Sequence, residues 1–322
     1  MITTLLLAVA LANPVDGTSP APFEEGFIAA PDGAKLHYRK IGNGPVTLIV
    51  PLDFILFDDF KQLADLATII FYDVRNRGRS SHVTDVKMLT INQDVTDLET
   101  VRDHFKVDRF VPVGFSYVGM MVMLYALDHP QHVSRIVQLG PLGTKWGTQY
   151  PKELTHGNED IAAPEADVKK WHEMQAQGMA EKSPRRFCEA QDKVFRYVLV
   201  GDPAHASRVK SHCDLPNELA SNLATHFAAS LESIKKVNIS KDQLNTITVP
   251  VLTIHGTKDR NAPYGGGREW AMSLPNARLV TVESAAHASW LDDPATVFAS
   301  IRQFLRGEWP LAAERVTTLQ RP

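Results

Sequence analysis

Short apolar runs alternate with helical stretches along most of the chain after residue 22. Unbroken apolar runs at 46–50 and 68–72 are typical of strands buried on both faces of a sheet. At 92–105 and 117–127, apolar residues are spaced as on one face of a helix. This alternation predicts a mostly parallel sheet covered by helices. Further strands are expected at 25–30, 35–40, 110–113, 134–139, 249–254 and 278–282, and a last helix at 294–305.

The alternation stops between residues 141 and 245. Helical, charged and aromatic segments follow one another there without a strong strand, and prolines interrupt them. Because the strand pattern resumes afterwards, 141–245 is predicted to be a helical cap inserted into one α/β domain, which is built from 22–140 and 246–306. Residues 307–322 lack a clear apolar face and are expected to form a partly loose tail.

Composition narrows the class of partner. The 322 residues include 34 Lys+Arg and 37 Asp+Glu, a net charge of −3, and 44% are hydrophobic. Such a chain is too apolar to be disordered throughout. Without an excess of positive charge, neither nucleic acid nor an anionic membrane surface is expected as its main partner. A small-molecule substrate of little charge is the partner that fits.

Residues 4–12 form an apolar run that is too short to span a bilayer. Ala10-Leu11-Ala12 has the small-x-small pattern of a signal-peptidase site, although no Lys or Arg precedes the run. We therefore expect 1–12 to be a cleaved signal and the protein to be periplasmic or secreted, with no stable membrane association after cleavage. If the run is instead a first strand or helix, the protein is cytoplasmic.

The chain has two cysteines, Cys188 and Cys213, and both lie in the inserted segment. In an exported protein they could pair, and closing that loop is worth about 3 kcal/mol in the chain-entropy model. Two separate buried thiols are the other possibility, because the sequence gives no distance between them.

The sharpest chemical signal is the segment around Ser116. The strand expected at 110–113 ends, Gly114 allows a tight turn with Ser116 at its apex, and an apolar helix begins at once. This is the context of a nucleophile elbow, in which a strained turn exposes the hydroxyl above the sheet at a helix N-terminus. In the usual pattern G-x-S-x-G, Val118 takes the place of the second glycine and Gly119 follows it. A serine that only caps a helix is the alternative.

Two later loops supply the other groups that such a serine needs. Asp259 follows the predicted strand at 249–254, and His287 follows the one at 278–282. Serine, acid and histidine in this order match one known hydrolase scaffold. Open α/β sheets place their sites at the carboxyl ends of strands, so we expect these three residues to meet.

Taken together, these segments resemble the α/β-hydrolase family, in its capped, proline-iminopeptidase-like and esterase-like branch. The segment 70–80 resembles the family's D-x-R-G-x-G-x-S stretch, with Asn76 at the first glycine. The segments 256–259 and 287–294 resemble its acid and histidine loops. The resemblance covers about residues 25–306 and implies an α/β-hydrolase fold with an inserted helical cap, and no cofactor or metal.

The resemblance also implies a serine hydrolase that cleaves a small carboxylic ester or amide. Ser116 would attack the carbonyl, His287 would take its proton, and Asp259 would orient the imidazole. Water would then hydrolyse the acyl-enzyme. An iminopeptidase-like aminopeptidase is the alternative within the same scaffold.

The oxyanion hole is where the chain departs from the family. Members usually have His-Gly after the third strand, whereas this chain has Pro51-Leu52. We expect the backbone N–H of Tyr117 as one donor and that of Leu52 or Asp53 as the other, and an inward-facing Asp53 carboxylate would repel the oxyanion. This departure, together with Val118, leaves open a non-catalytic hydrolase-fold protein that only binds a ligand.

Bulky residues of the cap suggest an apolar pocket over the serine. Glu189 and Asp192 lie one helical turn apart and would suit the α-ammonium group of an aminopeptidase substrate, or else form a solvated helix face. The candidate apolar lining consists of Trp146, Trp171, Phe187 and Phe195.

Overall fold

A nine-stranded β-sheet forms the centre of the computed structural model, which describes residues 23–159 and 161–321. The signal predicted at 1–12 lies outside these residues. The strand order is β1-β2-β4-β3-β5-β6-β7-β8-β9. The strands β4, β3, β5, β6, β7 and β8 run parallel to one another, as predicted. The strands are β1 (Glu24–Ala29), β2 (Lys35–Ile41), β3 (Val46–Pro51), β4 (Ala67–Tyr72), β5 (Val111–Phe115), β6 (Ile136–Leu139), β7 (Val251–Gly256), β8 (Ala277–Val282) and β9 (Ala313–Glu314).

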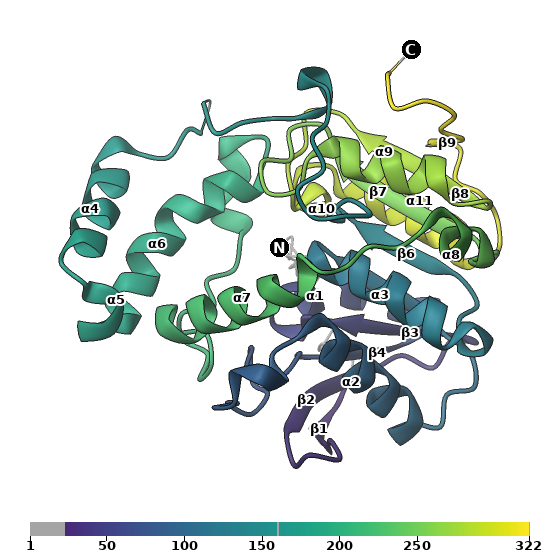
Figure 1. Ribbon diagram of the computed structural model, residues 1–322, viewed down its shortest axis with the longest axis horizontal. Coiled ribbons are helices and arrows are strands. Elements are labelled where there is room, and N and C mark those ends of the chain that lie inside the picture. The colour runs from purple at the N-terminus through teal and green to yellow at the C-terminus, as the bar shows by residue number, and fades with distance from the viewer. Residues whose placement is uncertain (1–22, 160, 322) are drawn as a thin grey trace, which may run out of the picture.

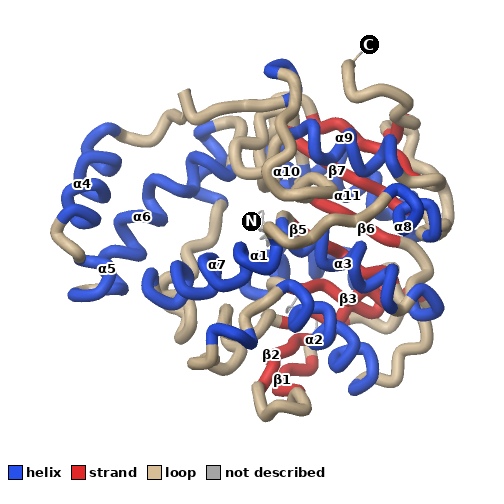
Figure 2. Tube along the Cα trace, viewed as in Figure 1, coloured by secondary structure: helices blue, strands red, loops and turns tan. Residues whose placement is uncertain are grey.

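The parallel strands are buried because helices cover the sheet (Figure 2). Helix α1 packs on α11 through Phe60 and Phe298, whose ring centroids lie 5.1 Å apart, while α2 packs on α3. The apolar runs of the central strands are therefore removed from water on both sides. The helices outside the cap are α1 (Asp53–Phe60), α2 (Ile91–His104), α3 (Tyr117–Asp128), α8 (Lys241–Thr246), α9 (Tyr264–Ser273), α10 (Ser289–Asp292) and α11 (Pro294–Leu305).

Helices α4 to α7, which lie between β6 and β7 in the chain, form a lobe beside the sheet (Figure 1). Its longer helices are α4 (Glu165–Ala176), α6 (Pro184–Leu199) and α7 (Ala220–Ile234), and the short α5 (Met179–Lys182) lies between the first two. A disulfide joins Cys188 of α6 to Cys213, which precedes α7, in a small apolar core of its own. Because α7 packs on α2, the lobe is held against the core at that helix.

The segment after α11 is packed, in contrast to the loose tail that its sequence suggests. Strand β9 pairs with β8, and Val316 is buried beside Leu279. Arg268 binds Glu314 and donates hydrogen bonds to three backbone carbonyls near the end of the chain. These contacts to one buried arginine hold the segment in place. The sequence does not predict them, because the segment has no apolar periodicity. None of the helices in the described part of the chain is long and apolar enough for a membrane span.

Candidate active site

Ser116 has a backbone conformation that few residues other than glycine adopt. It lies between β5 and α3 with φ 60° and ψ −128°. A side chain at Gly114 would lie 2.5 Å from the Val118 carbonyl oxygen, and one at Gly119 would lie 2.7 Å from Pro141 Cβ. These two glycines let α3 approach the sheet closely, so the turn at Ser116 is sharp. Val118 is buried but fits, because the closest approach falls on Gly119 instead.

A buried glutamine on β6 fixes the start of α3 to the sheet. Gln138 donates a hydrogen bond to the carbonyl of Gly119 and accepts one from the hydroxyl of Thr253 on β7, both at 2.9 Å. A buried amide that both donates and accepts in this way holds its partners in one arrangement. The sequence does not indicate this role, because a single polar residue in an apolar strand is also typical of a side chain that faces solvent.

Asp259 and His287 form a buried pair at the ends of β7 and β8. His287 Nδ1 lies 2.7 Å from Asp259 Oδ2, and each side chain is at most 2% exposed. A second histidine, His255 of β7, lies 3.0 Å from the same oxygen through its Nε2. The other carboxylate oxygen accepts the backbone N–H groups of Asn261 and Ala262.

Burial opposes the ionisation of Asp259, but the charge of His287 and the hydrogen bonds from His255 and His287 outweigh it. They hold the pKa of Asp259 well below its usual range. Asp259 is therefore a carboxylate at any physiological pH, and it orients the imidazole of His287 through Nδ1. His255 is a site residue that the sequence analysis missed, although its position at the end of a strand next to the acid loop was visible.

The histidine of this pair lies beside the serine turn. Its ring packs on Phe115, the residue before Ser116, with the ring centroids 4.6 Å apart. Gly140, which follows β6 and has φ +47°, closes the other side, because a Cβ there would lie 3.0 Å from Asp259 Oδ2 and 3.2 Å from His287 Nδ1. The structure thus brings Ser116, Asp259 and His287 together at the carboxyl edge of the sheet.

Leu52 turns the chain from β3 into α1 in the left-handed conformation, with φ 68° and ψ 51°. A residue with a side chain pays about 1–2 kcal/mol for that conformation. Asp53 and Tyr117 are the first residues of α1 and α3, so their N–H groups have no acceptor within the helix. The carboxylate of Asp53 is committed elsewhere, because Arg39 Nε lies 2.9 Å from both of its oxygens.

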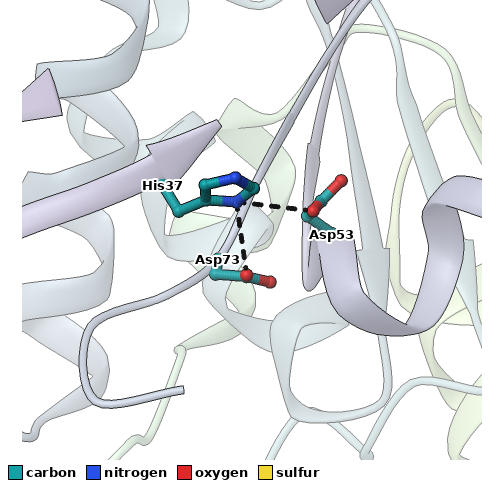
Figure 3. Close-up of side chains that lie close together, drawn as sticks. All are labelled: His37, Asp53 and Asp73. Atoms are coloured by element: carbon teal, nitrogen blue, oxygen red, sulfur yellow. Dashed lines mark ion pairs between the residues drawn. The ribbon is translucent and has the colours of Figure 1, made fainter. Parts of the chain in front are cut away.

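Figure 3 shows the buried cluster behind this turn, formed by His37 of β2, Asp53 of α1 and Asp73 after β4. His37 Nδ1 lies 3.5 Å from Asp53 and 3.6 Å from Asp73, while its Nε2 lies 2.7 Å from Glu25. Asp73 accepts the N–H groups of Phe54 and Arg79, both at 2.9 Å. The cluster therefore fastens the first turn of α1 to the sheet.

The charges of this cluster depend on one another. Burial and the nearby Asp73 raise the pKa of Asp53 to about 6, against the opposing effect of Arg39. Burial opposes the protonation of His37, but the carboxylates of Asp73, Glu25 and Asp53 outweigh it and raise the pKa of His37. A protonated His37 is thus the counter-ion of two buried carboxylates.

The same three side chains have donor atoms within 4.8 Å of one another, a spacing that would suit a divalent metal ion. Their oxygens are already engaged, however. Arg39 chelates Asp53, and two backbone N–H groups occupy Asp73. A guanidinium cation next to the site also disfavours a second cation. This donor set fits an ion-pair cluster better than a metal centre.

The cap residues singled out from the sequence do not gather in one place. Trp171 and Phe187 pack in the small core around the disulfide, whereas Trp146 and Phe195 are exposed. On α6, Glu189 is exposed and pairs with Arg185, while Asp192 is buried and pairs with Arg196. Both acids are therefore engaged with arginines of their own helix.

The cap contributes a different acid to the core. Glu218, which precedes α7, is fully buried; its Oε1 accepts Arg77 Nε at 2.6 Å and the Gly78 N–H at 2.8 Å. This pair joins the cap to the loop after β4. No local pattern could reveal it, because 141 residues separate the partners.

Comparison with known proteins agrees with this architecture. The model of the alpha/beta hydrolase fold family matches residues 60–294, well over half of the chain. The chain thus belongs to the α/β-hydrolase fold family, and the predicted fold class is confirmed. It is a hydrolase of that superfamily.

Among its relatives is a putative proline iminopeptidase of Mycoplasma pneumoniae, 24% identical over 315 residues, which covers 83% of this chain and 93% of the relative. The putative carbamate hydrolase RutD of Pseudomonas syringae is 26% identical over 267 residues, covering 78% and 98%. Among solved structures, an esterase from Exiguobacterium antarcticum superposes with a TM-score of 0.66 at 18% identity, covering 87% and 98%.

The ion-pair cluster leads to a pH-dependent prediction for stability. Because the pKa of His37 is raised above its ordinary value of 6.5, its contribution is fully present below that value and is lost as the pH rises through the folded pKa. We expect His37→Gln to lower the free energy of unfolding by about 3 kcal/mol near pH ~6, as for a broken buried pair, and by less near pH ~9. Urea denaturation of both proteins at the two pH values measures this difference.

His82→Gln is the matched control, because His82 is exposed. It should behave like the wild type at both pH values. An equal loss of stability at the two pH values for His37→Gln would show that the charge of His37 is not what stabilises the cluster.

Proposed function

We propose that this protein is a serine hydrolase that cleaves small carboxylic esters or amides through an acyl-enzyme formed on Ser116. One observation carries the proposal. A serine with a strained, positive φ lies beside a buried His287–Asp259 pair at the carboxyl edge of the sheet. The scaffold order of these residues and the family membership of the chain support the same interpretation.

In this mechanism the hydroxyl oxygen of Ser116 forms a bond to the substrate carbonyl carbon while His287 takes the hydroxyl proton. His287 then gives the proton to the leaving alcohol or amine as the carbon–heteroatom bond breaks. In the second half-reaction His287 removes a proton from water, which attacks the acyl-enzyme and frees Ser116. The ionised Asp259 favours the imidazolium that forms in each half-reaction.

The developing oxyanion needs two donors that are fixed before the reaction. The first N–H groups of α3 and α1, at Tyr117 and at Asp53 or Leu52, are our candidates. The ion pair of Asp53 with Arg39 supports this assignment, because a carboxylate engaged there is not available to repel an oxyanion. The position of the Asp53 carboxylate therefore does not argue against catalysis.

An aminopeptidase is the second candidate function. The observation that favours it is the similarity to a relative named as a putative proline iminopeptidase. Such an enzyme needs free carboxylates for the substrate's α-ammonium group. Glu189 and Asp192 pair with Arg185 and Arg196, which favours ester and neutral amide substrates over aminoacyl ones.

Labelling with a fluorophosphonate probe tests the nucleophile. We expect one covalent adduct on Ser116, located by peptide mass spectrometry, and a loss of at least about a thousandfold in ester hydrolysis for Ser116→Ala. Ser221→Ala, which changes an exposed serine of α7, should label and hydrolyse as the wild type does. A folded Ser116→Ala protein that keeps its activity would refute the proposed function.

Gly140→Ala tests the position of the histidine. Its Cβ would press on Asp259 Oδ2 and His287 Nδ1 and displace the pair, so we expect kcat for a short ester to fall about 10²-fold. Gly147→Ala is the control, because Gly147 also has a positive φ of +78° but a Cβ there would meet nothing within 4 Å. Equal activities of the two variants would place the catalytic groups away from Gly140.

We also propose that the protein is exported and that residues 1–12 are removed. The disulfide between Cys188 and Cys213 supports export, since disulfides persist in oxidising compartments. The N-terminal sequence of the chain isolated from its producing cells is the test, and we expect it to begin at Asn13. A cytoplasmic chain that retains Met1–Ala12 would overturn this proposal.

A further inference from the structure

Polar groups are buried where the cap meets the core beside the serine turn. From the cap come His226 of α7 and Glu218, and from the core come Arg77 and Tyr117. The ring centroids of His226 and Tyr117 lie 6.4 Å apart, and Tyr117 directly follows the proposed nucleophile. In Figure 1, α7 reaches from the cap toward the core. We call these four residues the cap–core polar cluster.

The cluster also borders the turn at Leu52–Asp53. The guanidinium of Arg77 lies over the ring of Phe54, 5.0 Å from its centroid. The ring centroids of Phe54 and His212, a cap residue, lie 5.7 Å apart. The polar cluster therefore extends from Phe54, which follows the candidate oxyanion donor Asp53, to Tyr117, which follows Ser116. A substrate held at Ser116 would have part of its structure against these side chains.

Several polar atoms of the cluster lack partners among the described residues. Both ring nitrogens of His226 are buried without a hydrogen bond, and the side chain is only 2% exposed. Glu218 Oε2 is also without one, and His212 Nε2 lies 3.9 Å from it. Native proteins rarely leave buried polar atoms unpaired, so a bound group is expected to complete them.

The unpaired atoms define the chemistry of that group. A neutral imidazole offers one donor and one acceptor, whereas Glu218 Oε2 can only accept. The bound group must therefore donate at least one hydrogen bond and can also accept one.

The charge of the bound group follows from the neighbouring residues. Arg77 already neutralises Glu218, and a further cation would be repelled by the guanidinium. Burial, with the charge of Arg77, lowers the pKa of His226 to about 3, so the imidazole is uncharged and does not attract an anion. A hydroxyl or an amide fits these conditions, whereas ammonium and carboxylate groups do not.

We propose that His226 and Glu218 Oε2 form a substrate subsite for an uncharged hydroxyl or amide group, and that His226 determines specificity for it. This inference rests on the proposed function, and it deepens it by naming a substrate class. A plain hydrocarbon bound there would leave the imidazole and the carboxylate oxygen unpaired, so the subsite discriminates against it.

Three esters that differ in one group test the proposal: the 4-nitrophenyl esters of 3-hydroxybutyrate, 3-methylbutyrate and 3-aminobutyrate. The substituents on carbon 3 are a hydroxyl, a methyl and an ammonium group, which are similar in size but differ in charge and hydrogen bonding. We expect the wild type to prefer the hydroxy ester over both others by about tenfold or more in kcat/KM. Acetate esters with the same groups on the alcohol side extend the test to a subsite for the leaving group.

Two substitutions then assign the preference to His226. His226→Leu should lose it, and the methyl ester should become the better substrate, whereas His226→Asn should restore part of it because the amide can donate and accept. His172→Leu is the control, since His172 is an exposed histidine of the cap. Thermal melting of each variant establishes that it is folded.

The inference and the proposed function fail in different ways. If Ser116→Ala still hydrolyses the methyl ester, the proposed function is wrong. If hydrolysis depends on Ser116 but the wild type treats both series of three esters alike, water alone completes the subsite and the inference is overturned. A preference for the hydroxy ester that persists in folded His226→Leu also overturns it.

Discussion

The backbone turn at Ser116 is the constraint on which the candidate site depends. A positive φ at a residue with a side chain is unfavourable, and it persists only where the surrounding structure requires it. Here Gly114 and Gly119 allow α3 to press against the sheet, and Gln138 ties the helix to β6. The turn consequently presents the serine at the same edge of the sheet as Asp259 and His287.

Two buried carboxylate clusters, one around Asp259 and one around Asp53, show how partners decide the charge of a buried acid. Burial opposes the ionisation of Asp259, but its two histidine partners, His287 and His255, outweigh burial and lower its pKa. Burial and a second carboxylate, Asp73, outweigh the effect of Arg39 on Asp53, so the pKa of Asp53 rises. The first arrangement keeps an acid ionised next to a histidine, and the second fastens the strained turn that begins α1.

The cap has its own core and its own disulfide, yet it also completes the surroundings of the serine turn. Glu218 and His226 come from the cap, while Arg77 comes from the loop after β4 and Tyr117 is the first residue of α3. Neither part holds the whole polar cluster, because the pairing of Glu218 with Arg77 forms only when the two are packed together. Changes in the cap can therefore alter the groups next to Ser116 without changing the turn itself.

The sequence by itself determined the α/β architecture, the inserted segment and the positions of Ser116, Asp259 and His287 in the chain. It could do so because buried parallel strands are continuous apolar runs, and because a strand–turn–helix with glycines has a local signature. Only the tertiary structure decided that His255 joins the acid, that Asp53 pairs with Arg39, and that Cys188 bonds to Cys213. It also decided that Glu189 pairs with Arg185 while Glu218 reaches the core. Except for Glu189 and Arg185, which share α6, these partners lie in different strands, helices or loops. Their distances depend on how those segments pack, which no local pattern of residues encodes.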